Sequence, residues 1–183
     1  PSEKTYFETS VFTHAKNRFL WLLLLMLSAA VTGAIITRYE DAFSAIPLLV
    51  SFIPMLMDTG GNCGSQSSTL IIRGIALDEI QFRDIFRVMF KEFRIALLVS
   101  AGLAVANGLR ILLFYHDLKL AIVISLSLIG TVILSKLIGC TLPLLAKKLH
   151  LDPAIMAAPL ITTVVDTCSI MIYFTIATQV FSL

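Results

Sequence analysis

Long apolar stretches alternate with short polar ones along this chain of 183 residues. Five of the apolar stretches are long enough to cross a hydrocarbon core of about 30 Å, which takes about 20 helical residues. Helix is the expected form, because lipid offers no hydrogen-bond partner to the backbone groups that an open strand leaves unpaired. The pattern therefore predicts an all-α membrane protein with five transmembrane helices, at residues 19–37, 44–72, 93–115, 120–146 and 154–183.

Two amphipathic segments accompany these spans, at residues 2–18 and 75–92. Apolar side chains recur every four positions in the first one, at Phe7, Val11, Ala15 and Phe19. Such a helix is expected to lie at the membrane interface or to dock on the bundle. We therefore divide the chain into a connecting helix at 1–18 and a five-span transmembrane domain at 19–183. A plain amphipathic connector is an equally good interpretation of both segments.

Composition supports a membrane location. The chain is 57% apolar and 14% charged, with a mean hydropathy of +0.91, whereas soluble domains are about 45–50% apolar and about 25% charged. A net charge of +2 says little about partners, and no nucleic-acid partner is expected. The three cysteines have no spacing typical of zinc sites and are interpreted as small packing residues; they are Cys63, Cys140 and Cys168.

Basic residues are distributed unevenly between the loops. Ten of the 14 fall on one side of the predicted membrane: Lys4, Lys16, Arg18, Arg73, Arg83, Arg87, Lys91, Arg94, Lys147 and Lys148. Three fall on the other side: Arg38, Arg110 and Lys119. The positive-inside rule then predicts a cytoplasmic N-terminus and an extracytoplasmic C-terminus. Lys136 lies within the fourth span, and its role is left open.

Two carboxylates lie inside predicted spans, Asp58 in the second and Asp166 in the fifth, while the other ten acidic residues lie in tails, loops or segment ends. A carboxylate at the bilayer centre costs about 2.5–3.5 kcal/mol on insertion scales, so such residues usually serve a function. Asp58 has a structural alternative, because it could cap a helix that starts near Gly60 and Gly61.

Helical spacing groups the polar residues of the second span. One face would carry Asp58, Asn62, Ser65, Gln66 and Thr69, which we call the polar stripe. Another face would carry Gly60, Gly64 and Ser68, a spacing of small residues that lets two helices approach closely. The segment is interpreted as the wall of a polar path held by close helix contacts. A hydrogen-bonded interface without a path is the alternative.

The fifth span has a matching face, formed by Ala158, Thr162, Asp166, Ser169 and Tyr173. Pro159 lacks an N–H group and leaves the carbonyl of Ile155 without its helical partner, so a bend is expected there. Carboxylate and carbonyl oxygens suit hard cations such as Mg²⁺ or Ca²⁺, and the lack of His and Cys argues against zinc or copper. One carboxylate per chain would hold a dication poorly, and two copies facing each other would hold it better.

The run PMLMDTGGNCGSQ at residues 54–66, continued by SSTLIIRG to residue 74, resembles the signature of the MgtE family of magnesium channels and transporters. The run from Pro159 through Asp166 to Tyr173 resembles it too. The resemblance implies a homodimer with an ion path at its interface, lined by the second and fifth spans. It implies that Asp166 holds hydrated Mg²⁺ and that the backbone carbonyl of Thr162 faces the ion.

The family also sets expectations for the rest of the protein. Its members usually carry cytoplasmic N-terminal and CBS domains that sense Mg²⁺, joined to the pore through a helix that residues 2–18 resemble. Those domains are absent from this sequence. It is expected to be either an isolated transmembrane domain or a natural short form, and its start with Pro rather than Met favours a piece of something longer. Ala158 stands where bacterial relatives often have Asn, and this puts the affinity and selectivity of the outer ion shell in question.

These observations predict a multi-pass protein of the cell (inner) membrane that passes hydrated Mg²⁺ through a homodimer pore, with Asp166 as the main ion ligand. The pore lining would be Asp58, Asn62, Ser65, Gln66, Thr69, Ala158 and Thr162. Mn²⁺ and Ca²⁺ are left open as further ions, and an alternating-access carrier is the alternative mechanism. An enzyme is not expected, since neither aspartate has the sequence context of an intramembrane aspartyl protease. A structural membrane anchor would not need the polar stripe.

Overall fold

The structure, a computed structural model, describes residues 4–156 and 158–183, and this part of the chain contains helices and short turns but no strand. The α-helices are α1 (Val11–Arg38), α2 (Glu40–Ser44), α3 (Leu48–Ser51), α4 (Ile53–Ala76), α5 (Ile85–Tyr115), α6 (Leu118–Lys148) and α7 (Ala158–Val180). Two short 3₁₀-helices are η1 (Phe82–Asp84) and η2 (Pro153–Met156). The predicted all-helical fold is confirmed.

Four helical stretches of the described chain are long and apolar enough to cross a membrane: Val11–Arg38, Phe82–Tyr115, Leu118–Lys148 and Pro159–Val180. They correspond to four of the five predicted spans. The remaining predicted span contains α4, whose 24 residues include the polar stripe.

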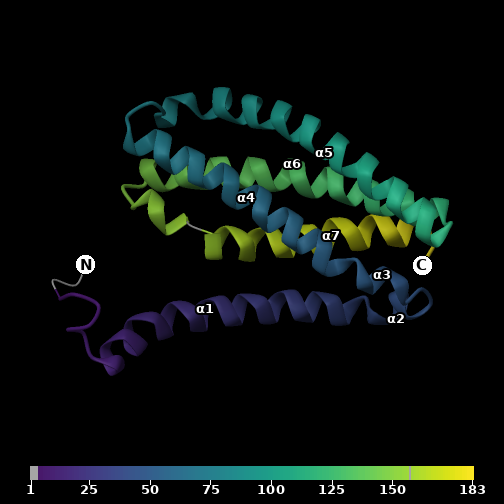
Figure 1. The fold of residues 1–183 in the computed structure, drawn as a ribbon, viewed down its shortest axis with the longest axis horizontal. Coiled ribbons are helices and arrows are strands. Elements are labelled where there is room, and N and C mark those ends of the chain that lie inside the picture. Colours follow the sequence, from purple (N-terminus) through teal and green to yellow (C-terminus); the bar gives the residue numbers. More distant parts are fainter. Residues whose placement is uncertain (1–3, 157) are drawn as a thin grey trace.

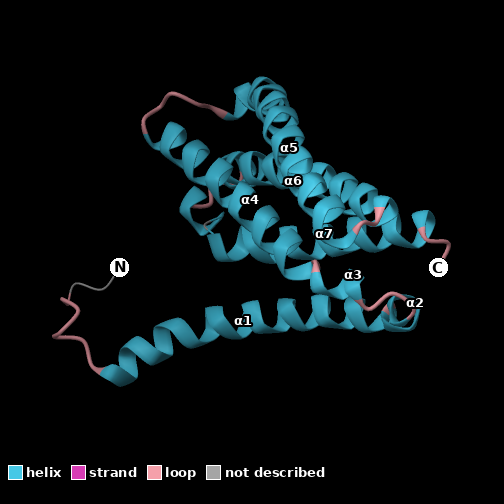
Figure 2. Cartoon of the chain, turned by 45° about the vertical axis from the view of Figure 1, so that its right-hand side comes forward, coloured by secondary structure: helices cyan, strands magenta, loops and turns pink. Residues whose placement is uncertain are grey.

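The helix α6 lies at the centre of the bundle, where it packs against α4, α5 and α7 (Figure 1). A further contact joins α4 directly to α7. In contrast, α1 runs along one side of the molecule and meets the bundle mainly at α7, where the hydroxyls of Thr32 and Thr167 are 3.1 Å apart (Figures 1 and 2). Most of the apolar surface of α1 is therefore left for lipid or another chain to cover.

The N-terminal amphipathic segment differs from its prediction. Residues 4–10 form turns, and α1 begins at Val11 because the Ser10 hydroxyl accepts a hydrogen bond of 3.2 Å from the Thr13 N–H. Side-chain caps of this kind start helices. From Val11 the helix continues into the first apolar stretch without a break, and the division at residue 18 stays a prediction.

The second apolar stretch, predicted as a span over residues 44–72, is not one continuous helix. The chain forms α2, α3 and α4 in succession, with Pro47 directly before α3 and Pro54 in the first turn of α4. Proline favours these positions because its missing N–H would be unpaired there in any residue. The two prolines therefore set where α3 and α4 begin.

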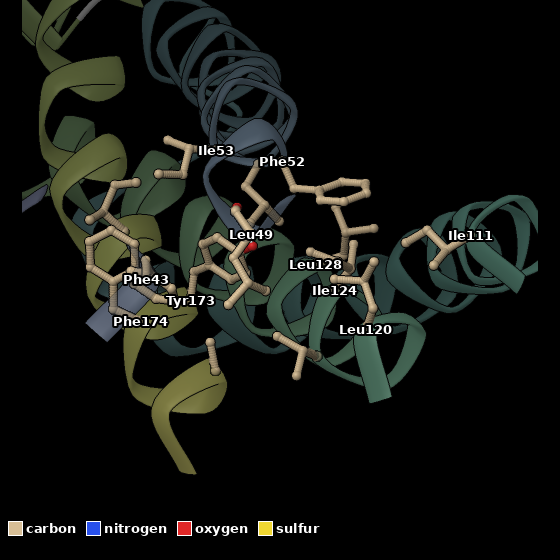
Figure 3. Packing of buried hydrophobic residues seen from close by; sticks show 14 of the residues in the cluster. Phe43, Leu49, Phe52, Ile53, Ile111, Leu120, Ile124, Leu128, Tyr173 and Phe174 are labelled. Carbon is tan, nitrogen blue, oxygen red and sulfur yellow. The ribbon is translucent and has the colours of Figure 1, made fainter. Parts of the chain in front are cut away.

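Aromatic side chains fix the start of α4 against α7 (Figure 3). The rings of Phe43 and Phe174 have centroids 4.4 Å apart. The buried hydroxyl of Tyr173 donates a hydrogen bond to the backbone carbonyl of Leu49. These contacts bind α2 and α3 to α7, so that α4 begins beside α7 and runs along it.

Candidate functional site

The helix α4 turns its small residues toward α6 and α7. A Cβ atom built on Gly60 would lie 2.8 Å from Thr131 Cγ2 and 2.9 Å from Ser169 Oγ. A Cβ on Gly139 of α6 would collide with the backbone of Gly64. The predicted close packing of this face is therefore confirmed. Its three residues, all buried, are Gly60, Gly64 and Ser68.

A hollow of about 350 Å³ opens between α4 and α7. Its polar lining comes from Asp58 and Asn62 on α4 and from Thr162 and Asp166 on α7. The rest of the lining is Ile53, Pro54, Met57 and Gly61. Two carboxylates that are far apart in the sequence thus reach the same small space.

A second, shallower hollow of about 610 Å³ continues along α4. It is lined by Asn62, Ser65, Gln66, Thr69 and Leu70. Since Asn62 lines both hollows, the five residues of the polar stripe border one continuous surface. Within a single chain this surface is open: Ser65 is half-buried and the other four are exposed. The bundle therefore carries a polar groove on its outside.

Asp166 is half-buried at the α7 side of the first hollow. One carboxylate oxygen, Oδ1, is buried and accepts no hydrogen bond from the described residues. Buried carboxylate oxygens normally have a partner, so an unpaired one is a candidate for binding an ion or water. The half-buried Thr162, one helical turn earlier, faces the same hollow. The side chain of Ala158 lies outside the described residues.

Two residues that were expected on the face of Asp166 lie elsewhere. Ser169 and Tyr173 are buried inside the bundle, Ser169 next to Gly60 and Tyr173 against Leu49. The residues that helical spacing assigns to one face cover a wide part of the helix surface. In α7, one part of that surface faces the hollow and the other part faces the core. Among the described side chains of the expected α7 face, Thr162 and Asp166 line the hollow.

A bend in the helix was expected at Pro159, but the structure shows none. Because α7 begins at Ala158, Pro159 occupies the first turn, where its missing N–H removes no helical hydrogen bond. Its own carbonyl accepts a hydrogen bond of 2.9 Å from the Thr163 hydroxyl. The proline therefore starts α7 rather than interrupting it.

The polar groups of the first hollow are all oxygen donors or amides, which suit hard cations. No group of three His, Cys, Asp or Glu side chains that could hold a metal ion occurs among the described residues. A single chain thus supplies two carboxylates, Asp58 and Asp166, to an open site. Such a site can attract a dication electrostatically but cannot enclose it.

Some residues of this region were not predicted. Gly61 lines the first hollow, and a Cβ on it would lie 3.3 Å from Thr162 Cγ2; its position three residues after Asp58 could have indicated this. Glu92 was placed among segment ends but is buried inside the bundle, where its carboxylate accepts a hydrogen bond of 2.9 Å from the Ser67 hydroxyl. Lys136 is also buried.

The helices and the hollow together define a class, that of all-helical membrane proteins with a polar groove suited to hard cations. The chain belongs to the MgtE family, since residues 53–176 match the model of that family, which is described as a divalent cation transporter. The match begins with α4 and extends into α7, so it includes both helices that line the hollow.

Named relatives agree with this assignment. The chain is 36% identical to "Magnesium transporter MgtE" of Bacillus subtilis over 172 residues, which are 94% of this chain and 38% of that protein. It is 36% identical to the protein of the same name from Thermus thermophilus, over 87% of this chain and 35% of that protein. The chain thus spans little more than a third of the length of these relatives.

Proposed function

We propose that this chain forms the membrane pore of a magnesium channel and that Asp166 is its main ion ligand. The observation that carries the proposal is the hollow between α4 and α7, which brings Asp58 and Asp166 together and leaves Asp166 Oδ1 without a hydrogen-bond partner among the described residues. The relatives named as magnesium transporters support Mg²⁺ as the substrate.

The size of the hollow supports a hydrated ion. Mg²⁺ dehydrates reluctantly and prefers six oxygen ligands. The hollow of about 350 Å³ has room for several waters, since each water needs about 10–15 Å³ of such space. Carboxylates that contact the ion through its waters would bind it weakly enough to let it leave, as conduction requires.

The proposal treats α4 as a membrane span in addition to the four helical stretches that are long and apolar enough to cross a membrane. Its 24 residues measure about 36 Å at about 1.5 Å per residue, enough for a hydrocarbon core of about 30 Å. It packs against α6 and α7, which have the composition of membrane-crossing helices. With the basic loops in the cytoplasm, the N-terminus is cytoplasmic and the C-terminus lies outside the cell membrane.

The exposed polar stripe supports a homodimer. A groove lined by Asp58, Asn62 and Gln66 would be costly against lipid, because polar groups there find no hydrogen-bond partners. A second copy packed on the same face would cover the stripe and bring a second Asp166 toward the first. The paired carboxylates would give the ion a binding site that one chain leaves incomplete.

Mg²⁺ flux into proteoliposomes that contain a Mg²⁺-sensitive dye tests the proposal. We expect Asp166→Asn to slow the flux by about tenfold or more, which corresponds to about 1.4 kcal/mol in the barrier. Asp41→Asn, the same change at an exposed position on α2, should leave the flux unchanged. Equal flux from the native chain and Asp166→Asn would refute the ligand role. Replacing Mg²⁺ by Mn²⁺ or Ca²⁺ measures selectivity, and single-channel currents distinguish a channel from a carrier.

A further inference from the structure

The start of α5 carries three distinct faces, and the bundle uses only one of them. Ile85, Met89 and the neighbouring Phe82 pack against the core formed by α4 and α6. This contact accounts for the amphipathic pattern of the segment, but it leaves the other two faces open. One of these faces carries basic side chains and the other carries aromatic side chains.

Four basic residues form the first open face. Arg87, Lys91 and Arg94 follow each other at spacings of four and three, which places them on one side of α5, and Arg83 precedes Arg87 by four residues in η1. All four are exposed. Within the described residues none of them forms an ion pair with a carboxylate. The nearby Asp84 carboxylate accepts a hydrogen bond of 3.0 Å from the Gln81 N–H. We call these four residues the basic stripe.

Aromatic residues form the second open face, between the basic stripe and the core. Phe86 and Phe90 are 80% and 62% exposed, values that water would disfavour for such large apolar rings. The two faces are in contact, since the Arg94 guanidinium lies 4.7 Å from the centroid of the Phe90 ring. A surface that is aromatic on one side and cationic on the other matches the boundary between acyl chains and headgroups.

The length of α5 places this surface at the headgroup level. Its 31 residues measure about 46 Å, whereas a hydrocarbon core of about 30 Å takes about 20 of them. The stretch 95–109 contains no charged residue and would fill most of that core. The segment 83–94 then extends beyond the core on the side of the basic loops.

We propose that the basic stripe and the adjoining rings of Phe86 and Phe90 bind the headgroup of an anionic phospholipid. The inference rests on the proposed placement of α5 across the membrane. The phosphate would pair with the guanidinium and ammonium groups while the acyl chains lie over the rings. The positive-inside rule accounts for basic residues on this side of the membrane, but it does not account for their alignment beside an exposed aromatic face.

Native mass spectrometry tests this inference on the chain released from vesicles of equimolar phosphatidylglycerol and phosphatidylcholine. The native chain should retain phosphatidylglycerol preferentially. We expect a preference for phosphatidylglycerol that is at least about fivefold lower in the variant with Arg83→Gln, Arg87→Gln, Lys91→Gln and Arg94→Gln. One basic residue near an anionic surface supplies about this factor. A control variant loses the same charge from exposed positions outside the stripe, through Lys16→Gln, Arg18→Gln, Lys147→Gln and Lys148→Gln, and should keep the preference.

Several results would overturn the inference. These are no preference in the native chain, an equal loss in both variants, or displacement of the lipid by excess inorganic phosphate, which would indicate a site for soluble anions.

Mg²⁺ flux in vesicles of phosphatidylcholine alone separates this inference from the proposed function. The stripe variant should keep the native flux there, because its substitutions lie outside the hollow. If the native chain gave no flux, the channel proposal would fail while lipid retention still decided the inference.

Discussion

Gly139 is the residue of α6 on which the close approach of α4 depends. A Cβ there would collide with the backbone of Gly64, and a backbone atom cannot rotate away as a side chain can. We expect Gly139→Ala to lower the free energy of unfolding by about 1–3 kcal/mol, as overpacking of a close contact does. Thermal unfolding of the detergent-solubilised chain, followed by circular dichroism, measures the change.

Gly102 of α5 supplies the control for this prediction. A Cβ at Gly102 would have no neighbouring atom within 4 Å. The same substitution there should be neutral or stabilise the helix by up to about 1 kcal/mol, because Ala is the better helix former. If Gly102→Ala and Gly139→Ala changed the unfolding temperature alike, the contact between α4 and α6 would not be as close as the structure places it.

Among the helices, α5 and α6 each carry one buried charged residue next to α4, Glu92 and Lys136. Cys63, Ala96 and Val132 form one cluster of these three helices. Ser67, Glu92 and Lys136 are also buried, and each lies one helical turn from a member of this cluster. Because α5 runs opposite to α4 and α6, all three lie toward the same end of the bundle. Glu92 and Lys136 therefore lie in one buried layer of the bundle, on the side of α4 away from the polar stripe.

A double-mutant cycle tests whether these two charges depend on each other. If the two buried charges stabilise each other, removing either one leaves the other unpaired, and Glu92→Gln and Lys136→Met should each cost about 3–5 kcal/mol of stability. The double variant should cost less than the sum of the two. Thermal unfolding in detergent gives all four values. Strictly additive losses would show that the two groups do not interact, and Glu92 would then act only through its hydrogen bond with Ser67.

The extent of each helix was predictable where lipid or solvent alone decides it. The fourth span, expected at residues 120–146, is α6 at Leu118–Lys148. The third was expected from residue 93 after an amphipathic segment at 75–92, and α5 joins part of that segment to the span, beginning at Ile85, because its first turns pack on α4 and α6. Tertiary contacts thus extend a helix beyond its apolar stretch. The glycines and prolines of the second span indicated an interrupted helix, but the apolar pattern runs across Pro47 and Pro54 and did not show where α4 begins.

For the molecule as a whole, helical spacing predicted residues that share a helix face but not contacts between helices. The polar stripe of α4 was predictable because a period of 3.6 residues relates all its members. That Asp58 meets Asp166 depends on how α4 crosses α7, which close packing at Gly60 and Gly64 decides. The same packing buries Ser169, which spacing alone could not separate from Asp166.

Under the proposed function, the arrangement of two copies decides whether the open groove becomes a pore. In a symmetric dimer, residues near the two-fold axis meet their own counterparts. Asn62→Cys and Gln66→Cys on the polar stripe should therefore form a disulfide-linked dimer on mild oxidation in membranes, since a disulfide needs Cα atoms within about 7 Å of each other. Gel electrophoresis without reductant detects the linked species.

Leu98→Cys places the thiol on α5 at a site that is 79% exposed, away from the groove, and should stay monomeric. The native chain serves as the blank, because its three cysteines are buried or half-buried. Equal cross-linking at Leu98 and Asn62 would indicate random collision in the membrane, and no cross-linking at either stripe position would leave the groove facing something other than a second copy.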